Sequence, residues 1–304
     1  MGKFDGQVAI VTGAGGGIGR EHALLLAAEG AAVVVNDYGG DGLGTPGTSA
    51  RADAVVEEIT ASGGIAVSDS GDVSTSAEAI VQRAVEAFGG LHVVMNNAGI
   101  GGHGTLDTVT ADEFERSLAI HLRGTVEMCK SAFPIFAKQN YGRIVNTSSG
   151  AVFGLARTYP YIAAKAAVFG FTRAIANDCQ SLNIKVNTIM PVAYSRLMEG
   201  SPVAVFAQAN LQTSKISPFA CALASRDVPC TGETFSVGGG RAARVVLATV
   251  PGLLDASSID TVLSRFDEAL GSDDFYVPKG GFDEIVYGCT QLGLDPTTII
   301  APAV

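Results

Sequence analysis

Three residues in the middle of the chain have the types and spacing that proton transfer to an oxygen atom requires. Tyr161 and Lys165 are four positions apart, so on a helix they lie on the same face. Ser148 precedes Tyr161 by thirteen positions, at the end of a strand-like run over residues 143–148. A phenol, an amine and a hydroxyl brought together can move a proton on and off a carbonyl or alcohol oxygen. We therefore expect Ser148, Tyr161 and Lys165 to be catalytic.

The lysine is the group that would adapt this tyrosine to work near neutral pH. A free phenol has a pKa near 10. A positive charge about 4 Å away is worth up to roughly 4 kcal/mol at an effective dielectric of 20, or about three pKa units at most. We expect Lys165 to lower the pKa of Tyr161, and Ser148 to hold the substrate oxygen beside it. Ser149 points the other way if the strand continues, so it is the minor candidate.

A glycine-rich turn near the N-terminus predicts a dinucleotide phosphate site. An apolar, β-branched run over residues 7–12 predicts a buried strand. Gly13, Gly17, Ile18 and Gly19 follow it and lead into a helical stretch. Glycines let the backbone approach a pyrophosphate, and the helix N-terminus offers free N–H groups to it.

The strand predicted next, over residues 32–37, ends in an acidic side chain. The carboxylate of Asp37 can accept hydrogen bonds from ribose hydroxyls, and it repels the additional phosphate of NADP. The alternative is a strand-end aspartate that only caps a turn. We expect NAD to be the cofactor.

Together these motifs resemble the short-chain dehydrogenases/reductases over roughly residues 5–240. The resemblance rests on the glycine turn, on Asn96-Asn97-Ala98-Gly99, and on Ser148, Tyr161 and Lys165. It implies hydride transfer between a secondary alcohol or ketone and NAD, with Tyr161 and Lys165 also beside the nicotinamide ribose. Further cofactor contacts are implied at Asp72, Val73, Asn97, Ala98, Gly99 and Pro191.

Two positions depart from the pattern of that family. His121 stands where the family usually has an asparagine that acts through its backbone and a water molecule in a proton relay. A backbone role survives this change, and the imidazole, with an unperturbed pKa near 6.5, can itself join the relay. The alternative is a core histidine hydrogen-bonded inside the helix. Val192 follows Pro191 where the family commonly has glycine, which changes the turn before the substrate loop.

Shorter strings resemble a narrower group, the dehydrogenase part of type 2 peroxisomal multifunctional enzymes and their bacterial relatives. They are residues 121–124 and 35–40, a glycine-rich insertion over residues 39–49, and a C-terminal extension. This resemblance implies a 3-hydroxyacyl-CoA substrate, in some cases steroid-derived. Two alternatives stay open: a dehydrogenase of hydroxysteroids or other secondary alcohols, and a non-catalytic NAD-binding scaffold.

The elements that must position these residues alternate between strand and helix. Strands are predicted over residues 7–12, 32–37, 65–69, 92–96, 143–148, 185–190 and 234–237, and helices over 17–29, 50–62, 74–88, 111–138, 160–181 and 217–225. This alternation predicts an α/β fold with a doubly wound parallel sheet, Rossmann-like, in three layers. Pro134 is expected to kink or end its helix.

The same pattern divides the chain into two parts. Residues 1–240 are expected to form the NAD-binding and catalytic domain, with a lid over 191–216. Residues 241–304 are expected to form a C-terminal extension packed on the core or on a partner subunit, with a strand near 242–250 and a helix near 258–270.

Composition argues against several other classes of protein. The net charge of −10 disfavours nucleic-acid binding, and the sequence has no apolar run of membrane-spanning length. The first strand begins almost at once, and the chain does not end in a Ser-Lys-Leu type signal. The five scattered cysteines include no Cys-x-x-Cys pair. We expect a cytoplasmic enzyme with a small-molecule substrate, no metal and no membrane contact. The family resemblance implies a homodimer or homotetramer.

Overall fold

The computed structural model describes residues 2–40, 47–194, 204–254, 256–271 and 273–295. The chain divides into two compact units, Met1–Arg244 and Val245–Val304, and each is described by itself. Parts of the predicted glycine-rich insertion over 39–49 and of the predicted lid over 191–216 lie outside the described residues.

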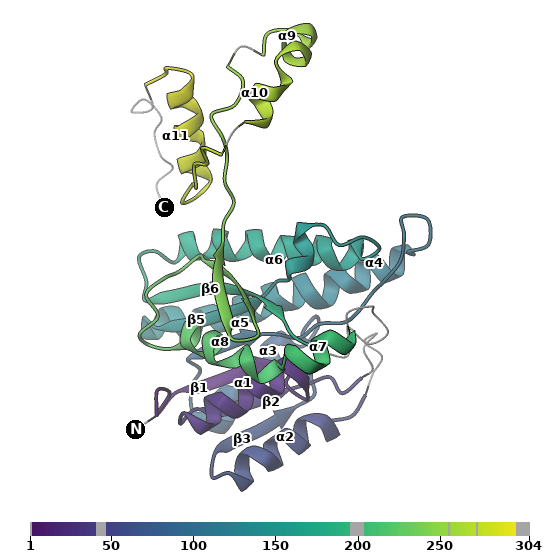
Figure 1. Cartoon of the computed structure of the whole chain (residues 1–304). Helices are drawn as coiled ribbons and strands as arrows, with labels where there is room; N and C mark the ends of the chain where they lie inside the picture. The colour runs from purple at the N-terminus through teal and green to yellow at the C-terminus, as the bar shows by residue number, and fades with distance from the viewer. Residues whose placement is uncertain (1, 41–46, 195–203, 255, 272, 296–304) are drawn as a thin grey trace. The chain divides into compact units, whose positions relative to one another are not determined.

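A single sheet runs through the first unit in the order β3-β2-β1-β4-β5-β6-β7-β8 (Figure 1). Every pair from β3 across to β7 is parallel. The order reverses between β1 and β4, which opens a crevice at the carboxyl ends of the strands. The strands are β1 (Val8–Thr12), β2 (Ala32–Asn36), β3 (Ile65–Asp69), β4 (Val93–Asn96), β5 (Gly142–Thr147), β6 (Ile184–Val192), β7 (Thr234–Gly238) and β8 (Arg241–Val245).

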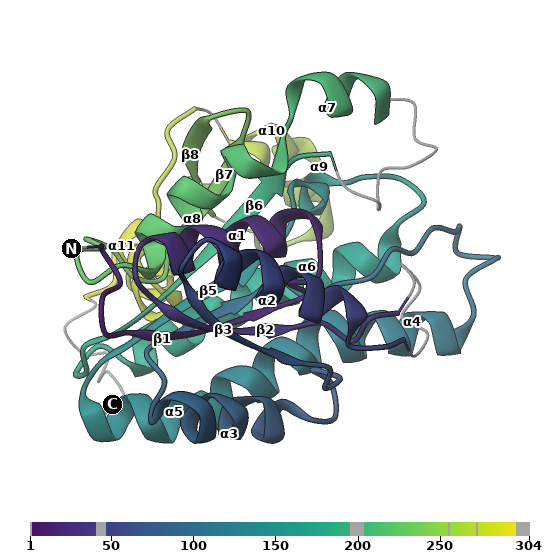
Figure 2. The ribbon, with the colours of Figure 1, turned by 90° about the horizontal axis from the view of Figure 1, so that it is seen from below.

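Helices cover both faces of this sheet, which confirms the predicted doubly wound α/β fold. On one face α1, α2 and α8 pack with Val11 and Val33, and on the other α3, α5 and α6 pack with Ile10 and Val34 (Figure 2). Consecutive residues of a strand therefore pack into the hydrophobic clusters on opposite faces of the sheet, because side chains alternate along a strand. The helices are α1 (Gly17–Ala28), α2 (Ala50–Ala61), α3 (Ala77–Phe88), α4 (Ala111–Leu118), α5 (Gly124–Gln139), α6 (Tyr159–Asp178), α7 (Ala204–Asn210) and α8 (Ser217–Ala224).

The helix predicted over residues 111–138 is interrupted, but not where the sequence suggested. Pro134 lies inside α5, which continues to Gln139, so the expected end near this proline was wrong. Proline removes one backbone hydrogen bond, and the rest of the helix is held by its packing on α3 and β5. The departure from α-helix is instead a π-helical turn, η1 (Ala119–Arg123), which separates α4 from α5 and contains His121.

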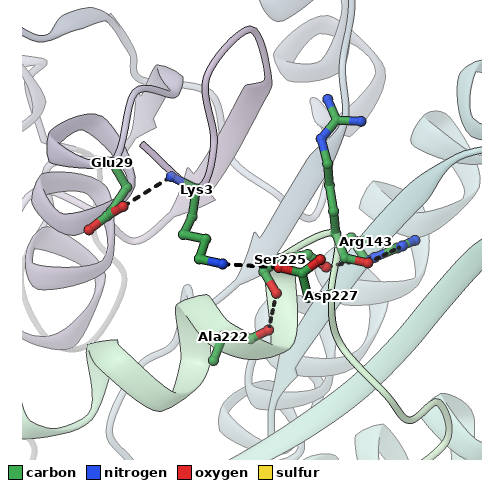
Figure 3. A network of polar contacts seen from close by, with 7 residues as sticks. Lys3, Glu29, Arg143, Ala222, Ser225 and Asp227 are labelled. Carbon is green, nitrogen blue, oxygen red and sulfur yellow. Dashed lines mark hydrogen bonds and ion pairs between the residues drawn. The ribbon is translucent and has the colours of Figure 1, made fainter. Parts of the chain in front are cut away.

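Arg143 is a buried cation that closes the edge of the sheet away from the crevice. Its guanidinium donates to the carbonyls of Ser225 and Asn183 at 2.9 Å each, and only 2% of the residue is exposed. Figure 3 shows it beside the surface ion pair of Lys3 and Asp227, which are 3.1 Å apart. Because backbone carbonyls surround the charge, Arg143 ties β5 to the segment after α8 and serves the fold rather than the chemistry.

His22 of α1 is a second buried polar group, and it predicts a pH dependence of stability. Its Nδ1 lies 2.8 Å from the hydroxyl of Ser217 in α8, and burial lowers its pKa to about 3. Between pH 6.5 and about 3, His22 is protonated in the unfolded chain but stays neutral in the folded chain. The free energy of unfolding therefore falls as the pH drops from about 6.5 towards 3, by about 3 kcal/mol at pH 4 from this group.

We expect His22→Asn to keep a polar partner for Ser217 and to remove this titration. Chemical denaturation at several pH values should then show a flatter curve for the variant between pH 7 and pH 4. Parallel curves for the two proteins would contradict the assignment. The absolute stability at pH 7 is not the readout, because the smaller side chain also leaves a cavity.

In its described residues, the second unit contains three short helices: α9 (Ile259–Ser264), α10 (Phe266–Leu270) and α11 (Gly281–Gln291). The helix predicted near 258–270 is thus split into α9 and α10, and α11 was not predicted. The rings of Tyr276 and Tyr287 stack 4.2 Å apart. Among the residues of this unit that the structure describes, no side chain is buried.

Candidate active site

A cavity of about 550 Å³ lies at the carboxyl ends of the strands. Segments far apart in the sequence meet there. It is lined by residues of the turn after β1 (Gly13, Gly16, Gly17, Ile18), of the segment after β2 (Asn36 to Gly40), of residues 71–73, of the stretch Asn97 to His103, of η1 (Ile120, His121), of the β5–α6 region (Thr147, Ser149, Gly150, Ala151, Leu155, Thr158, Tyr161, Lys165) and of the end of β6 (Pro191, Val192, Ala193).

The glycine turn has the backbone shape that an approach to phosphate needs. Gly13 and Gly17 have φ values of 64° and 54°, in the left-handed region that favours glycine. A Cβ on Gly13 would come within 2.8 Å of the Ala98 Cα. Gly19 does not line the cavity; a Cβ there would strike the carbonyl of Gly13, so this glycine permits the packing of the turn.

The N-terminus of α1 is open towards this cavity. Gly16 is its N-cap, and no side-chain cap and no acid in the first turn satisfies the free N–H groups. Those N–H groups and the positive end of the helix dipole favour an anion such as a pyrophosphate.

Asp37 follows β2, at the place where a carboxylate that binds the ribose hydroxyls is expected. Its Oδ2 accepts from the N–H of Gly15 and its Oδ1 accepts from the N–H of Gly39, each at 2.8 Å. These two bonds fix the carboxylate in the cavity wall and leave its other lone pairs free to accept. The sequence prediction and the structure place Asp37 in the same position, at the wall of the cavity.

The loop after β4 is fastened to the loop after β1. The Asn97 side chain donates to the carbonyls of Thr12 and Gly13 at 3.0 and 3.2 Å. The hydroxyl of Thr12 in turn accepts from the N–H groups of Asn97 and Ala98. The other predicted cofactor residues, Asp72, Val73, Gly99 and Pro191, also line the cavity.

The structure separates the two adjacent serines: Ser149, the minor candidate from the sequence, lines the cavity, and the predicted Ser148 does not. The Ser148 hydroxyl donates to the carbonyl of Lys165 at 2.8 Å, the residue is 1% exposed, and it does not line the cavity. Ser149 lines the cavity, and its side chain hydrogen-bonds the phenol of Tyr161. The pairing of β5 with β6 continues to Ser148, whose N–H donates to Ile189, so the two serines point in opposite directions.

Tyr161 and Lys165 lie together on α6, as their spacing predicted. The Nζ of Lys165 is 5.7 Å from the centre of the Tyr161 ring and donates to the carbonyl of Thr147 at 2.7 Å. Both side chains line the cavity.

Burial acts on the pKa of Tyr161 against the lowering that Lys165 is expected to cause. Burial raises the pKa of Tyr161, and the hydrogen bond with Ser149 only partly opposes this. Burial also lowers the pKa of Lys165 to about 7. The reason is common to both: an environment shielded from water disfavours each charged form, so near neutral pH the amine keeps only part of its charge.

His121 is buried and neutral. Its Nε2 lies 3.0 Å from the carbonyl oxygen of Ile100, and its ring meets the Tyr161 ring edge-on at 5.1 Å between centres. Burial, followed by the charge of Lys165, holds the pKa of His121 well below its ordinary value. The hydrogen-bonded core alternative is therefore partly correct, although the partner is a neighbouring loop rather than the helix. An imidazolium relay near neutral pH is disfavoured.

The described residues were also compared with the requirements of a metal site and of a membrane-spanning helix. They include no group of three His, Cys, Asp or Glu side chains placed to hold a metal ion. Among the helices of the described ranges, none has the length and apolar character to span a bilayer.

Comparisons with known proteins agree with this geometry. The profile of the short chain dehydrogenase family matches residues 7–201. A short-chain type dehydrogenase/reductase of Mycobacterium tuberculosis is 38% identical, over 79% of this chain and 85% of that protein. Peroxisomal multifunctional enzyme A of Dictyostelium discoideum is 38% identical, over 83% of this chain and 57% of that protein.

A solved structure is similar as well. Full-length peroxisomal multifunctional enzyme type 2 of Drosophila melanogaster superposes with a TM-score of 0.78 at 29% identity, covering 95% of this chain and 50% of that one. The chain thus spans about half the length of these peroxisomal relatives. Since the family profile covers more than half of the chain, and the fold and the cavity agree with it, this protein belongs to the short-chain dehydrogenase/reductase family of nicotinamide-dependent oxidoreductases.

Proposed function

We propose that this chain is an NAD-dependent dehydrogenase whose substrate is a 3-hydroxyacyl-CoA thioester. The observation that carries the proposal is a single cavity with Asp37 in one wall and Tyr161, Lys165 and Ser149 in another. The similarity to peroxisomal multifunctional enzymes supports the thioester as substrate. Steroid-derived acyl groups belong to the same proposal.

In this proposal each polar side chain has one task. Bound NAD would supply the acceptor for the hydride that leaves the alcohol carbon of the substrate. Tyr161 takes the proton of the alcohol in oxidation and returns it in reduction. Ser149, hydrogen-bonded to that phenol, holds the substrate oxygen in place, the role that the sequence spacing predicts for Ser148.

Lys165 and His121 have different roles beside Tyr161 in this proposal. Lys165 supplies a proton-accepting amine whose pKa of about 7 lets it exchange protons near neutral pH, and it would also bind the nicotinamide ribose. His121, neutral and edge-on to Tyr161, positions the phenol ring rather than carrying a proton.

Asp37 is the proposed basis for a preference for NAD. We expect Asp37→Asn to raise the KM for NAD about tenfold or more and to lower the KM for NADP, because a charge-assisted hydrogen bond is worth roughly 1.5–3 kcal/mol. Initial rates with both cofactors measure the ratio. Asp112→Asn removes the same charge from the exposed first turn of α4 and should leave the ratio unchanged. An unaltered ratio in Asp37→Asn would remove this assignment.

The substrate class is tested by absorbance at 340 nm. Purified protein is incubated with NAD and a 3-hydroxyacyl-CoA, beside the matching free acid and a hydroxysteroid. NADH formation that requires the thioester supports the proposal. Turnover of the steroid or the free acid alone would replace it with a secondary-alcohol dehydrogenase. Absence of turnover despite NAD binding would favour the non-catalytic scaffold.

We also propose separate roles for the two parts of the chain. Residues 1–240 would carry the NAD site and the chemistry, with a lid over 191–216, and residues 241–304 would be an extension that packs on the core or on a partner subunit. Its support is that the described part of residues 245–304 buries no side chain, so it has no core of its own. The proposed assembly is a homodimer or homotetramer; a monomer mass by light scattering would contradict it.

A further inference from the structure

Arg157 has a backbone conformation that is rare for its residue type. Its φ is 66°, and the only other described non-glycine residue with positive φ is Asn140 at 49°, the C-cap of α5. Asparagine tolerates this region well, whereas arginine has no local gain from it. Unfavourable conformations of this kind persist where surrounding structure holds them, and they are concentrated at functional sites.

One backbone hydrogen bond to Arg157 and one between its neighbours fix this segment beside the cavity lining. The N–H of Gly104 donates to the carbonyl of Arg157 at 2.8 Å, within a bridge that pairs Gly104 with Thr158. The Thr158 hydroxyl donates to the carbonyl of Leu155 at 2.9 Å. Because Leu155 and Thr158 both line the cavity, Arg157 is fixed between two lining residues.

The same bridge brings a second nitrogen-bearing side chain to this place. His103 precedes Gly104, lines the cavity and is exposed. Two segments more than fifty residues apart in sequence therefore meet beside the cavity. The exposed His103 lines it, and the exposed Arg157, which does not line it, lies in the chain between the lining residues Leu155 and Thr158.

Neither side chain is neutralised by a neighbour in the described part of the chain. The ion pairs there do not include Arg157 or His103. The acid closest in sequence, Asp107, accepts a hydrogen bond from the hydroxyl of Thr105. In a chain of net charge −10, this unpaired cation beside the cavity is suited to an anionic ligand.

We propose that Arg157 and His103 bind an anionic oxygen group of the substrate, either a phosphate of a CoA carrier or a carboxylate, outside the reacting end. The inference rests on the proposed function for its choice of substrates. A planar guanidinium binds phosphate or carboxylate through two parallel hydrogen bonds, and an imidazole N–H adds a third donor. Leu155, 57% exposed beside Arg157, offers an apolar contact to the chain that links this anion to the reacting carbon.

Arg157→Gly is the informative variant, because it removes the guanidinium and also removes the conformational cost of a left-handed backbone, which glycine adopts readily. CoA is titrated calorimetrically into protein saturated with NADH, so that the adenine of CoA does not enter the dinucleotide site. If the anion is a phosphate, we expect CoA binding to be about tenfold weaker or more in Arg157→Gly and only partly restored in Arg157→Lys, whose amine keeps the charge but not the two parallel hydrogen bonds. The thermal midpoint of Arg157→Gly should equal or exceed the wild-type value.

Kinetics separate the two sources of the anion. For a phosphate, Arg157→Gly should raise the KM for a 3-hydroxyacyl-CoA about tenfold with kcat unchanged, and leave the KM of the matching N-acetylcysteamine thioester, which has no phosphate, unaltered. For a carboxylate, the KM increase should instead appear with the free hydroxy acid. Unchanged CoA binding and unchanged KM values for all three substrates would overturn the proposal.

Failure of this inference differs from failure of the proposed function. Thioester turnover that persists while CoA binding and the KM values of all three substrates are equal in both proteins would remove the anion site and keep the dehydrogenase. Weaker CoA binding by Arg157→Gly in a protein that oxidises no thioester would keep the anion site and remove the proposed reaction.

Discussion

Tyr161→Phe should lose about 10³-fold in kcat and keep its affinity for NAD. The phenol is the one group on the cavity wall that meets Ser149 by a hydrogen bond, Lys165 at 5.7 Å from its ring centre and His121 edge-on. Removing one oxygen atom leaves this packing in place but removes the proton donor and acceptor, and general acid–base catalysis contributes roughly 10²–10⁴-fold. Rates at saturating substrate measure the loss, and quenching or calorimetry measures NAD binding.

A second tyrosine supplies the control. Tyr159 starts the same helix, α6, two residues earlier, and its ring packs 6.0 Å from Phe114 rather than on the cavity. Tyr159→Phe should therefore retain near-normal turnover. If Tyr161→Phe also turned over substrate at a near-normal rate, the proposed chemistry would be wrong for this cavity.

The two serines should give opposite results although they are adjacent. We expect Ser149→Ala to lower kcat about 100-fold, because the hydrogen bond to Tyr161 and to the substrate oxygen is lost in the transition state. Ser148→Ala should keep most of the kcat and instead reduce stability, since its hydroxyl is buried on the carbonyl of Lys165 at 2.8 Å. Steady-state kinetics and denaturation of the same preparations compare the two effects.

A structural effect of Ser149 must be separated from its proposed role. Its hydroxyl also accepts from the N–H of Ala151 at 3.1 Å and so caps the short 3-10 turn η2 (Gly150–Phe153). Ser149→Thr keeps a hydroxyl at this place and should recover much of the lost rate. The reverse ranking, with Ser148→Ala inactive and Ser149→Ala active, would restore the original sequence interpretation.

Local sequence patterns determined the order of the elements and the position of the cofactor site. Apolar runs such as 7–12 and 32–37 are strands in the structure because a strand buried on both faces needs continuous β-branched side chains. The glycines at 13 and 17 could be predicted since their backbone conformations are open to few other residues. The four-residue spacing of Tyr161 and Lys165 likewise follows from helix geometry alone.

Other features depend on segments that meet only in the folded chain. Which of Ser148 and Ser149 faces the cavity is decided by how far the pairing with β6 extends, and one residue reverses the direction of a side chain. Pro134 is accommodated because tertiary packing supports α5, while the turn at His121 departs from α-helix. Neither outcome has a local sequence signal.

Sequence spacing alone determined that Tyr161 and Lys165 share one face of a helix, and the resemblance to a family predicted that they form one site with the glycine turn and Asp37. Only the tertiary structure decided their protonation, since burial raises the pKa of Tyr161 and lowers that of Lys165 to about 7. It also placed Arg157 beside His103, through a hydrogen bond from Gly104 across two loops. The physical reason is range: backbone preferences act over a few residues, whereas desolvation and side-chain contacts depend on every segment that surrounds the site.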